Sequence, residues 1–345
     1  MTLSAGERAA AAASDERAAI ETSDAGTAGG QLVAAGIVGV GGALPPRIVP
    51  NEEITPAIGV EPDWIVRRTG IRERRYAEPD APLAALAAEA GAAALADAGV
   101  PGADVDLVLV ATCSQDSVMP NAAPQVAHAL GAHDAAAFDI GSACTGFISA
   151  LAAARGMLSS GAASAALVIG AEIMSRHVDP ADRNTAALFG DGAGAVLCTA
   201  GGVGALGPVV LGADGAHAGL IVADRRTQLL GMDGHETFKQ AVRRLSEASL
   251  AACNAYGVAL ADVDLFVYHQ ANSRILGSLG ERLGIDPGRV VDCIATLGNT
   301  SAASVPLALE SARRDGRLAP GAHVLLAAAG SGFTWGATVI EWGLR

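Results

Sequence analysis

Aromatic and charged residues are scarce in this 345-residue sequence. They make up 3% and 17% of it, whereas hydrophobic residues, many of them alanine, make up 51%. No apolar run approaches the roughly 18 to 20 residues that a membrane-spanning helix needs. The positive mean hydropathy of +0.36 therefore indicates small residues in close contact inside a protein core, and we expect no association with a membrane.

Positive charge is also in deficit. The sequence has 23 basic and 36 acidic residues, which gives a formal net charge of −13. A protein of this charge repels phosphate backbones, and no dominant basic segment offsets the repulsion. We therefore expect no binding to nucleic acid.

Signs of paired or metal-binding cysteines are missing. The five cysteines show no CxxC spacing, and no secretory leader is visible. This pattern favours reduced thiols in a cytoplasmic protein and disfavours a structural metal site. Residues 1–30, rich in Ala, Ser, Gly and acidic residues, have no regularly spaced large apolar residue, and we predict that they form a disordered extension.

The chain contains an internal duplication. Residues 102–107 (GADVDL) have a near copy at residues 260–265 (LADVDL), an offset of 158 (265 − 107). The same offset relates the apolar runs 167–169 and 325–327. Matches in one constant register predict two equivalent halves with similar connectivity.

Each predicted half, residues 31–204 and residues 205–345, alternates short apolar runs with helical segments, which indicates α/β layers with largely parallel strands. The predicted strands are 37–40, 107–111, 165–170, 209–211, 265–268 and 324–329, and the predicted helices are 81–98, 146–158, 236–254 and 302–314. Two such halves that bury similar faces against each other predict a five-layer αβαβα sandwich with pseudo-twofold symmetry. We expect functional side chains where the strands end.

Cys144 lies where a strand-like run ends and a helix begins. A thiol at a helix N-terminus experiences the positive end of the helix dipole, so we predict a lowered pKa and a reactive sulfur. Small neighbours, Gly141, Ser142 and Ala143, permit a sharp turn and close approach of a substrate. The alternative is a buried, inert cysteine, and this is the interpretation that we give to the other four: Cys113, Cys198, Cys253 and Cys293.

Two further residues are weak signals when taken singly. His269 follows a predicted strand, and a histidine there is most often a satisfied core residue. Asn299 lies in a segment of small and polar residues, where it could serve as a turn residue or a helix cap. The order Cys144, His269, Asn299 is more informative than any of the three alone.

The three motifs together resemble the Cys-His-Asn set of the thiolase-fold condensing enzymes, and most closely that of beta-ketoacyl-ACP synthase III. The resemblance covers about residues 33–345 and implies a duplicated thiolase-like fold. The strings that support it are WIVRRTGIRER (64–74), DPADR (179–183), FGDGAG (189–194), HQAN (269–272), GNTSAAS (298–304) and GFTWG (332–336).

The resemblance implies an acyltransferase that condenses an acyl-CoA with malonyl-ACP and needs no cofactor. Cys144 would take the acyl group from acyl-CoA, with the backbone N–H groups of Cys144 and Ser331 as the oxyanion hole. Malonyl-ACP would then lose carbon dioxide, and His269 and Asn299 would donate hydrogen bonds to the enolate. The carbanion would attack the acyl-enzyme and give a beta-ketoacyl-ACP.

Further roles follow from the same resemblance. Trp64 and Arg183 would clamp the CoA adenine, Arg68 would contact the CoA phosphates, and Asn272 would support His269 beside the CoA site. Met119 would close the acyl pocket of a partner subunit, which implies a homodimer.

An acidic carrier protein would be attracted by cations near the motifs. Lys239, Arg243 and Arg244 share a predicted helix, and Arg274 and Arg282 flank the His269 motif. They predict a basic patch that binds acyl carrier protein. The alternative is an ordinary solvated face.

The sequence departs from the family pattern beside the predicted oxyanion hole. Ala329 stands where the family commonly has phenylalanine, and Ser331 replaces a glycine, so the acyl specificity is open. The glycines in 190–194 precede a strand-like run rather than a helix, which favours packing glycines over a phosphate loop.

Other activities were weighed against condensation. An acyltransferase of the same fold could pass its acyl group to an oxygen nucleophile, but it would need no enolate donors such as His269 and Asn299. A catalytically silent partner subunit would be expected to lack Cys144. Chalcone-synthase-like enzymes act on CoA-bound malonyl groups, and the Trp64 and Arg183 strings point away from them. The sequence assigns neither the starter acyl group nor the pathway, fatty-acid or polyketide.

Overall fold

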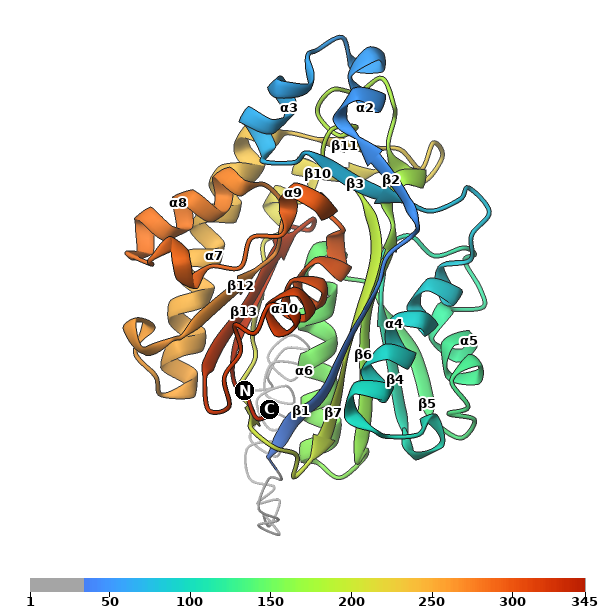
Figure 1. Ribbon diagram of the computed structural model, residues 1–345, viewed down its shortest axis with the longest axis vertical. Coiled ribbons are helices and arrows are strands. Elements are labelled where there is room, and N and C mark those ends of the chain that lie inside the picture. Colours follow the sequence, from blue (N-terminus) through green and yellow to red (C-terminus); the bar gives the residue numbers. More distant parts are fainter. Residues whose placement is uncertain (1–33, 345) are drawn as a thin grey trace, which may run out of the picture. The chain divides into compact units, whose positions relative to one another are not determined.

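The computed structural model describes residues 34–344, so the predicted disordered extension lies outside the described residues. The first of two large sheets has the strand order β1-β7-β6-β4-β5 (Figure 1). β4 is parallel to β5 and to β6, whereas β7 is antiparallel to both β6 and β1. The strands are β1 (Ala35–Ala43), β4 (Leu107–Ala111), β5 (Ala136–Ile140), β6 (Ala165–Ile173) and β7 (Asp191–Ala200).

The second large sheet has the order β12-β13-β14-β8, and β9 also pairs with β14. β12 and β13 are parallel, and β14 is antiparallel to its neighbours. These strands are β8 (Ala205–Leu206), β9 (Val210–Ala213), β12 (Leu265–Tyr268), β13 (His323–Gly330) and β14 (Thr334–Glu341). Two small two-stranded antiparallel sheets pair β2 (Arg47–Pro50) with β3 (Glu73–Tyr76) and β10 (Ile221–Ala223) with β11 (Leu230–Met232).

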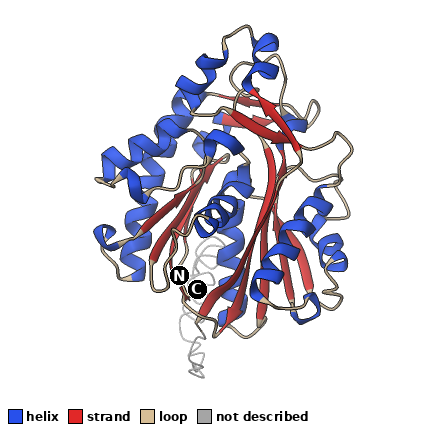
Figure 2. Cartoon of the chain, in the orientation of Figure 1, coloured by secondary structure: helices blue, strands red, loops and turns tan. Residues whose placement is uncertain are grey.

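Helices cover both sheets and separate them (Figure 2). α4 (Leu83–Ala98) and α5 (Ala122–Ala129) pack on the outer face of the first sheet. α6 (Gly146–Ser159) and α10 (Ser304–Arg314) lie between the sheets, and α7 (Gly234–Tyr256) and α8 (Ser273–Leu283) cover the second sheet. This is the predicted five-layer αβαβα sandwich, so the predicted fold class is confirmed. The prediction of largely parallel strands is wrong, because β7 and β14 run antiparallel to all their neighbours. The short helices α2 (Asn51–Ile58), α3 (Pro62–Thr69) and α9 (Ile294–Leu297) pack at one end of the layers.

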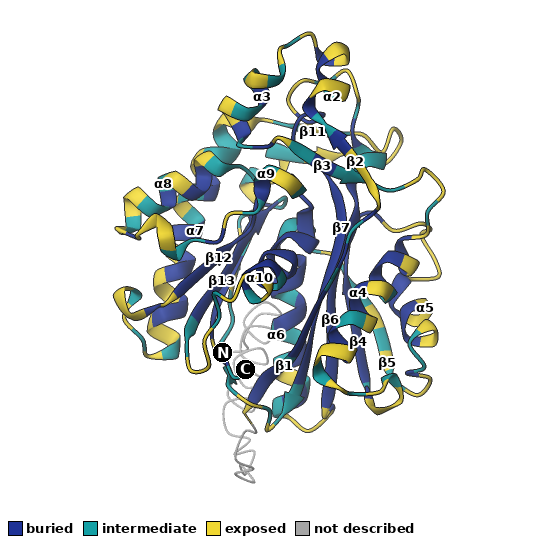
Figure 3. Cartoon of the chain, viewed as in Figure 1, coloured by how far each residue is buried: buried dark blue, intermediate teal, exposed yellow. Residues whose placement is uncertain are grey.

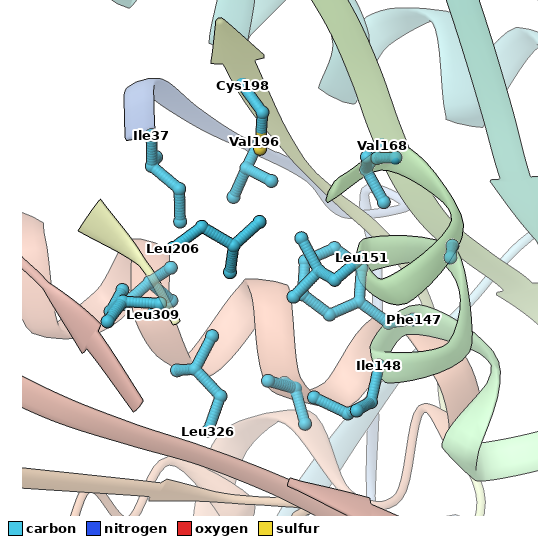
Figure 4. Packing of buried hydrophobic residues seen from close by; sticks show 14 of the residues in the cluster. Ile37, Phe147, Ile148, Leu151, Val168, Val196, Cys198, Leu206, Leu309 and Leu326 are labelled. Carbon is cyan, nitrogen blue, oxygen red and sulfur yellow. The ribbon is translucent and has the colours of Figure 1, made fainter. Parts of the chain in front are cut away.

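The central helices join the two sheets in one apolar core (Figure 4). Phe147 and Leu151 of α6 and Leu309 of α10 belong to the same buried cluster as Val196 of the first sheet and Leu326 of the second. Most strands of the two large sheets and much of α6 and α10 are dark blue in Figure 3, whereas β5 and the outer helices also show exposed residues. Removing apolar surface from water across this interface is what holds the two halves together.

Small residues allow the layers to approach closely, as the composition predicted. A Cβ atom added at Gly41 of β1 would lie 2.3 Å from the backbone nitrogen of Ala94 in α4. One added at Gly194 of β7 would lie 2.7 Å from the backbone nitrogen of Leu307 in α10. Gly190, Gly192 and Gly194 are all in such contacts, and β7 begins within their run, so they are packing glycines.

The duplication is visible element by element. Elements that begin 158 residues apart have the same type and order. The pairs are two single turns of 3₁₀ helix, η1 (Gly102–Asp104) and η5 (Leu260–Asp262), the strands β4 and β12, two further 3₁₀ turns, η2 (Ala143–Thr145) and η7 (Ser301–Ala303), the helices α6 and α10, and the strands β6 and β13.

The predicted boundary between the halves at residues 204 and 205 falls between β7 and β8. The division into two domains stays a prediction, because the described residues form one compact unit. Within residues 34–344, no helix has both the length and the apolar character needed to cross a membrane.

Candidate active site

Cys144 sits in the 3₁₀ turn η2, between the end of β5 and the start of α6. The residue before it, Ala143, has a left-handed backbone with φ of 43°. Opposite is Gly330, the last residue of β13, where an added Cβ atom would lie 2.8 Å from Cβ of Cys144. Only a glycine at position 330 leaves room for the cysteine in this place.

The environment of Cys144 differs from the one predicted. Burial raises the pKa of its thiol to about 11 and outweighs the opposing effect of a hydrogen bond with Ser301, and the charge of Glu172 raises it further. The prediction of a lowered pKa is wrong, because desolvation is larger than the benefit of the nearby helix start. The free enzyme therefore holds a protonated thiol, whose proton leaves as the sulfur attacks.

His269 follows β12, and its backbone N–H donates to the carbonyl oxygen of Ala327 at 2.8 Å. The side chain is buried, and desolvation lowers its pKa to about 4. At neutral pH the imidazole is therefore uncharged and carries one N–H donor. Its Nδ1 atom has no hydrogen-bond partner among residues 34–344.

Asn299 is held by three hydrogen bonds. Its N–H donates to Leu188 at 2.9 Å, and its carbonyl oxygen accepts from Gly190 at 3.0 Å. Its side-chain oxygen accepts from the N–H of Ser301 at 2.9 Å. Because the amide oxygen is occupied, the side-chain NH₂ group is left to donate into the cavity.

One cavity of about 610 Å³ brings Cys144, His269 and Asn299 together. Other lining residues were also predicted from the sequence: Trp64, Arg68, Arg183, Asn272, Arg274, Ala329 and Ser331. Apolar side chains such as Phe189, Ile221, Leu230, Met232 and Phe238 cover much of the remaining wall. A mostly apolar pocket with a few polar groups suits an acyl chain on a polar carrier.

Trp64 is flanked by two arginines. The guanidinium carbon of Arg68 lies 4.7 Å from the centre of its ring, and that of Arg183 lies 5.0 Å away. An aromatic base between Trp64 and Arg183 would need about 7 Å, or two van der Waals contacts of about 3.5 Å each. Arg183 must therefore move by about 2 Å to form the predicted adenine clamp.

Asn272 caps α8 and joins two segments of the cavity wall. Its side-chain NH₂ donates to the carbonyl of Arg68 at 3.1 Å, and its side-chain oxygen accepts from the N–H of Arg274 at 2.9 Å. Neither bond goes to His269, so the predicted support of that residue stays a prediction.

Met119 does not line the cavity of its own chain and is 79% exposed, beside Val118 at 80%. A role in a partner's pocket stays a prediction.

Ala329 and Ser331 lie on either side of Gly330, the last residue of β13, and both line the cavity. The hydroxyl of Ser331 donates to the carbonyl of Ile221 at 2.7 Å, so its side chain is turned to the β10 strand.

The predicted carrier-binding cations differ in their surroundings. Lys239 pairs with Glu236 at 3.2 Å, and Arg244 pairs with Asp214 at 3.0 Å. Arg274 lines the cavity and lies over the ring of Phe238. Arg282 is in the last turn of α8, about 12 Å further along the helix axis. Arg243 donates to Gln240 at 2.6 Å.

Two residues of the site were missed by sequence reasoning. Cys113 was grouped with the inert cysteines, but it lines the cavity and contacts Glu172. Cys113 is exposed to the cavity and not buried as predicted. Partial desolvation and the charge of Glu172 raise the pKa of its thiol well above the usual range, so its sulfur is a poor nucleophile. The second missed residue is Glu172. It is the one charged residue in the apolar strand β6, and a lone charge in an apolar run was the sequence signal that could have identified it.

No cluster of three or more metal-ligating side chains occurs in the described part of the chain.

The duplicated sandwich and its shared Cys-His-Asn cavity define a thiolase-fold condensing enzyme, which is an acyltransferase. Residues 138–215 match the family model described as 3-oxoacyl-[acyl-carrier-protein (ACP)] synthase III, and residues 253–342 match the model of its C-terminal part. The chain belongs to the beta-ketoacyl-ACP synthase III family, as the sequence motifs predicted.

Relatives of known sequence and structure agree with this assignment. The beta-ketoacyl-[acyl-carrier-protein] synthase III of Bordetella petrii is 46% identical over 88% of this chain and 96% of its own. The beta-ketoacyl-[acyl-carrier-protein] synthase III 2 of Streptomyces coelicolor is 45% identical over 89% and 93%. The crystal structure of 3-oxoacyl-(acyl carrier protein) synthase III from Pseudomonas aeruginosa has a TM-score of 0.86, with 40% identity over 90% and 98%. The priming beta-ketosynthase from the R1128 polyketide biosynthetic pathway has a TM-score of 0.87, with 36% identity over 91% and 98%.

Proposed function

We propose that this protein condenses an acyl-CoA starter with malonyl-ACP to give a beta-ketoacyl-ACP, and so begins a fatty-acid or polyketide chain. The observation that carries the proposal is one cavity lined by Cys144, His269 and Asn299, with Trp64 and its two arginines on the same wall. The names of the relatives support the same reaction.

In the first half-reaction, Cys144 attacks the thioester carbonyl of acyl-CoA. Its S–H proton leaves, a new C–S bond forms, the bond to the CoA sulfur breaks, and CoA departs as a thiol. The backbone N–H groups of Cys144 and Ser331 stabilise the oxyanion of the tetrahedral intermediate. Trp64, Arg68, Arg183 and Asn272 hold the CoA portion.

In the second half-reaction, malonyl-ACP loses carbon dioxide, and its electron pair becomes an enolate. The neutral imidazole of His269 and the side-chain NH₂ of Asn299 donate to the enolate oxygen. The carbanion then attacks the acyl group on Cys144, whose sulfur leaves and regains a proton. Neutral donors suit this step, because the charge they stabilise is transient and no proton has to remain on them.

The partners that we propose are acyl carrier protein and a second copy of this chain. β5 is an edge strand of the first sheet, and Phe138 on it is 39% exposed. Val118 and Met119, in the loop between β4 and α5, are exposed too. An unpaired edge strand and exposed apolar side chains are suited to pairing across a homodimer. Lys239, Arg274 and Arg282 would guide the acidic carrier to the cavity. We place the protein in the cytoplasm, where free cysteines stay reduced.

The test uses a panel of acyl-CoAs followed by malonyl-ACP. Intact-protein mass spectrometry should find one acyl group on the wild type and none on Cys144→Ala, and malonyl-ACP should release it as beta-ketoacyl-ACP. An adduct that persists in Cys144→Ala would show that another residue is the nucleophile. If the acyl group is instead transferred to an alcohol and no carbon dioxide is released, the protein is an oxygen acyltransferase and the proposed condensation is wrong.

A further inference from the structure

Glu172 is a charged side chain buried inside the apolar strand β6. It is fully buried and lies next to the active-site cavity, but the proposed half-reactions do not use it. A buried carboxylate is costly unless it is compensated. No lysine, arginine or histidine within residues 34–344 forms an ion pair with Glu172, so hydrogen-bond donors alone compensate its charge.

The donors come from two segments that are far apart in sequence. After β4, the hydroxyls of Thr112 and Ser114 donate at 3.1 and 2.5 Å, and the N–H and S–H groups of Cys113 donate at 3.1 and 3.2 Å. From the other half, the hydroxyl of Ser301 in η7 donates at 2.9 Å. Glu172 therefore joins the first half of the fold to the turn that follows Asn299.

That turn needs support, because Ser301 has φ of 48°. A left-handed backbone is unfavourable for a non-glycine residue and persists only when its surroundings hold it. While the hydroxyl of Ser301 is bound to Glu172, its N–H donates to the side-chain oxygen of Asn299. The hydrogen bonds from Glu172 through Ser301 to Asn299 thus orient the Asn299 side chain so that its NH₂ group faces the cavity.

Glu172 also acts on the nucleophile. Its charge raises the pKa of the Cys144 thiol, whereas Ser301, whose hydroxyl donates to Glu172, lowers that pKa. The other titratable groups on the cavity wall beside Cys144 are Cys113, after β4, and His269, after β12. Both are uncharged at neutral pH, because desolvation and Glu172 raise the pKa of Cys113, and desolvation lowers the pKa of His269. Glu172 is therefore the charged group on these elements that acts on the Cys144 sulfur.

The duplication sharpens the contrast. The position equivalent to Glu172 in the second half is Gly330, 158 residues later. Glu172 is the last residue but one of β6, and Gly330 is the last residue of β13. Each lies against the 3₁₀ turn of the other half, Glu172 against Ser301 and Gly330 against Cys144. In the second half, the missing side chain of Gly330 leaves room for Cys144. In the first half, the equivalent position carries the carboxylate of Glu172.

We propose that Glu172 is a positioning residue: it orients Asn299 through Ser301, and it holds a negative charge behind Cys113 and Ser301, which line the cavity together with Cys144. The inference rests on the proposed function for the role of Asn299, but its effect on Cys144 can be measured without any substrate. Two variants separate the two roles. Glu172→Gln keeps the size and removes the charge, and Glu172→Asp keeps the charge and shortens the reach by one methylene group.

The first measurement is the pH dependence of Cys144 alkylation by iodoacetamide, followed by peptide mass so that Cys113 is counted separately. Glu172→Gln should move the midpoint to lower pH by on the order of one unit, because a nearby negative charge no longer opposes the thiolate. Glu172→Asp should stay near the wild-type midpoint. A Glu172→Gln midpoint equal to that of the wild type would overturn the electrostatic role.

The second measurement compares acylation with condensation in single turnovers. Glu172→Asp should acylate within about threefold of the wild type but condense at least tenfold more slowly, since its carboxylate cannot reach both segments. Ser301→Ala, which keeps the charge and cuts the same link, should condense as slowly as Glu172→Asp. Its alkylation midpoint should not move to lower pH, because the Ser301 hydroxyl that it removes lowers the pKa of Cys144. Condensation at the wild-type rate in both variants would overturn the positioning role.

A control separates these effects from general damage. Asp106 lies before β4, at the opposite end from Cys113, and accepts from Ser164 and Ala165. Asp106→Asn should lower the melting temperature without moving the alkylation midpoint or the ratio of the two half-reactions. If the wild type forms no beta-ketoacyl product, the proposed function fails, and the alkylation midpoints still decide whether Glu172 acts on Cys144.

Discussion

Ala143 and Ser301 lie 158 residues apart and have almost the same left-handed backbone, with φ of 43° and 48°. Each begins a 3₁₀ turn that leads into a central helix, α6 or α10. In the first half the next residue is Cys144, and in the second half it is Ala302. The same strained turn therefore presents a nucleophile in one half and orients the amide of Asn299 in the other.

The strain at position 143 predicts which substitutions are tolerated. Ala143→Gly should acylate within about threefold of the wild type, because glycine adopts positive φ without a Cβ penalty. Ala143→Val should acylate at least tenfold more slowly, since a β-branched residue is a true outlier there and would move Cys144. Stopped-flow acylation with acetyl-CoA measures both. Equal rates in the two variants would show that this backbone does not position the sulfur.

The two donors to the enolate should be separable from acylation. His269→Ala and Asn299→Ala are expected to acylate Cys144 but to condense about a hundredfold more slowly or worse, because losing one preorganised oxyanion donor costs roughly 3 kcal/mol. Quenched-flow mass spectrometry resolves the acyl-enzyme and the product. An equal loss of both steps would contradict this division of roles.

The buried neutral His269 predicts a pH dependence of stability. Its folded pKa is about 4, below the ordinary value of 6.5, so the unfolded chain binds a proton first as the pH falls. The stability that the uncharged imidazole contributes is fully present above pH 6.5 and is lost as the pH falls towards 4. This changes the free energy of unfolding by about 3 kcal/mol. Urea unfolding at pH 7.5 and pH 4.5 should show a smaller loss in His269→Gln than in the wild type. An identical loss would mean that His269 does not titrate in this way.

Carrier binding should depend on α8. Arg282→Glu should lower kcat/KM for malonyl-ACP on the order of tenfold at low salt, with a smaller effect at high salt, because steering by surface charge is screened. Acylation by acetyl-CoA should be unchanged. Arg274→Glu should also impair carrier use, but its place on the cavity wall makes Arg282 the cleaner test. Arg314→Glu, an equal charge change on α10, is the control. Loss of carrier use in all three variants would point to net charge alone.

Much of this fold could be predicted because its signals are local in the sequence. The offset of 158 residues was enough to identify β4 as the equivalent of β12, and α6 as the equivalent of α10, in the two halves. The predicted helices ended within about two residues of α4, α6, α7 and α10. Helices α5 and α8 were not predicted, since α5 is short and α8 follows directly on the His269 motif that was analysed for its chemistry.

The site was harder to predict where tertiary contacts decide the chemistry. The helix-dipole argument for Cys144 used only the local chain, whereas its pKa is set by burial under the second half of the fold. Glu172 was passed over because the predicted strand stopped at residue 170, although β6 runs to Ile173. Its partners on η7 are about 130 residues away in sequence, and no local pattern joins them.

Ala329 should set the size of the starter acyl group. It lines the cavity at the end of β13, opposite Trp335 on β14, and shares a cluster with buried Phe333. The family commonly has phenylalanine here, so the methyl group leaves space beside Cys144 that a packed interior would otherwise fill. Ala327 and Ala337, in the same cluster, are too small to reach into that space. A bulkier starter is therefore the group that fits it.

The test is a graded series, Ala329→Leu and Ala329→Phe, assayed with a short linear, a branched and a bulky acyl-CoA. Acylation by the bulky starter should fall in the order of side-chain size, at least tenfold in Ala329→Phe, while the short starter changes by less than about threefold. One methylene of misfit is worth roughly 1 to 3 kcal/mol in an apolar pocket, so the effect should be selective. A uniform change across the three starters would show instead that the larger side chain disturbs Cys144 itself, because Gly330 next to it is already in tight contact with that residue.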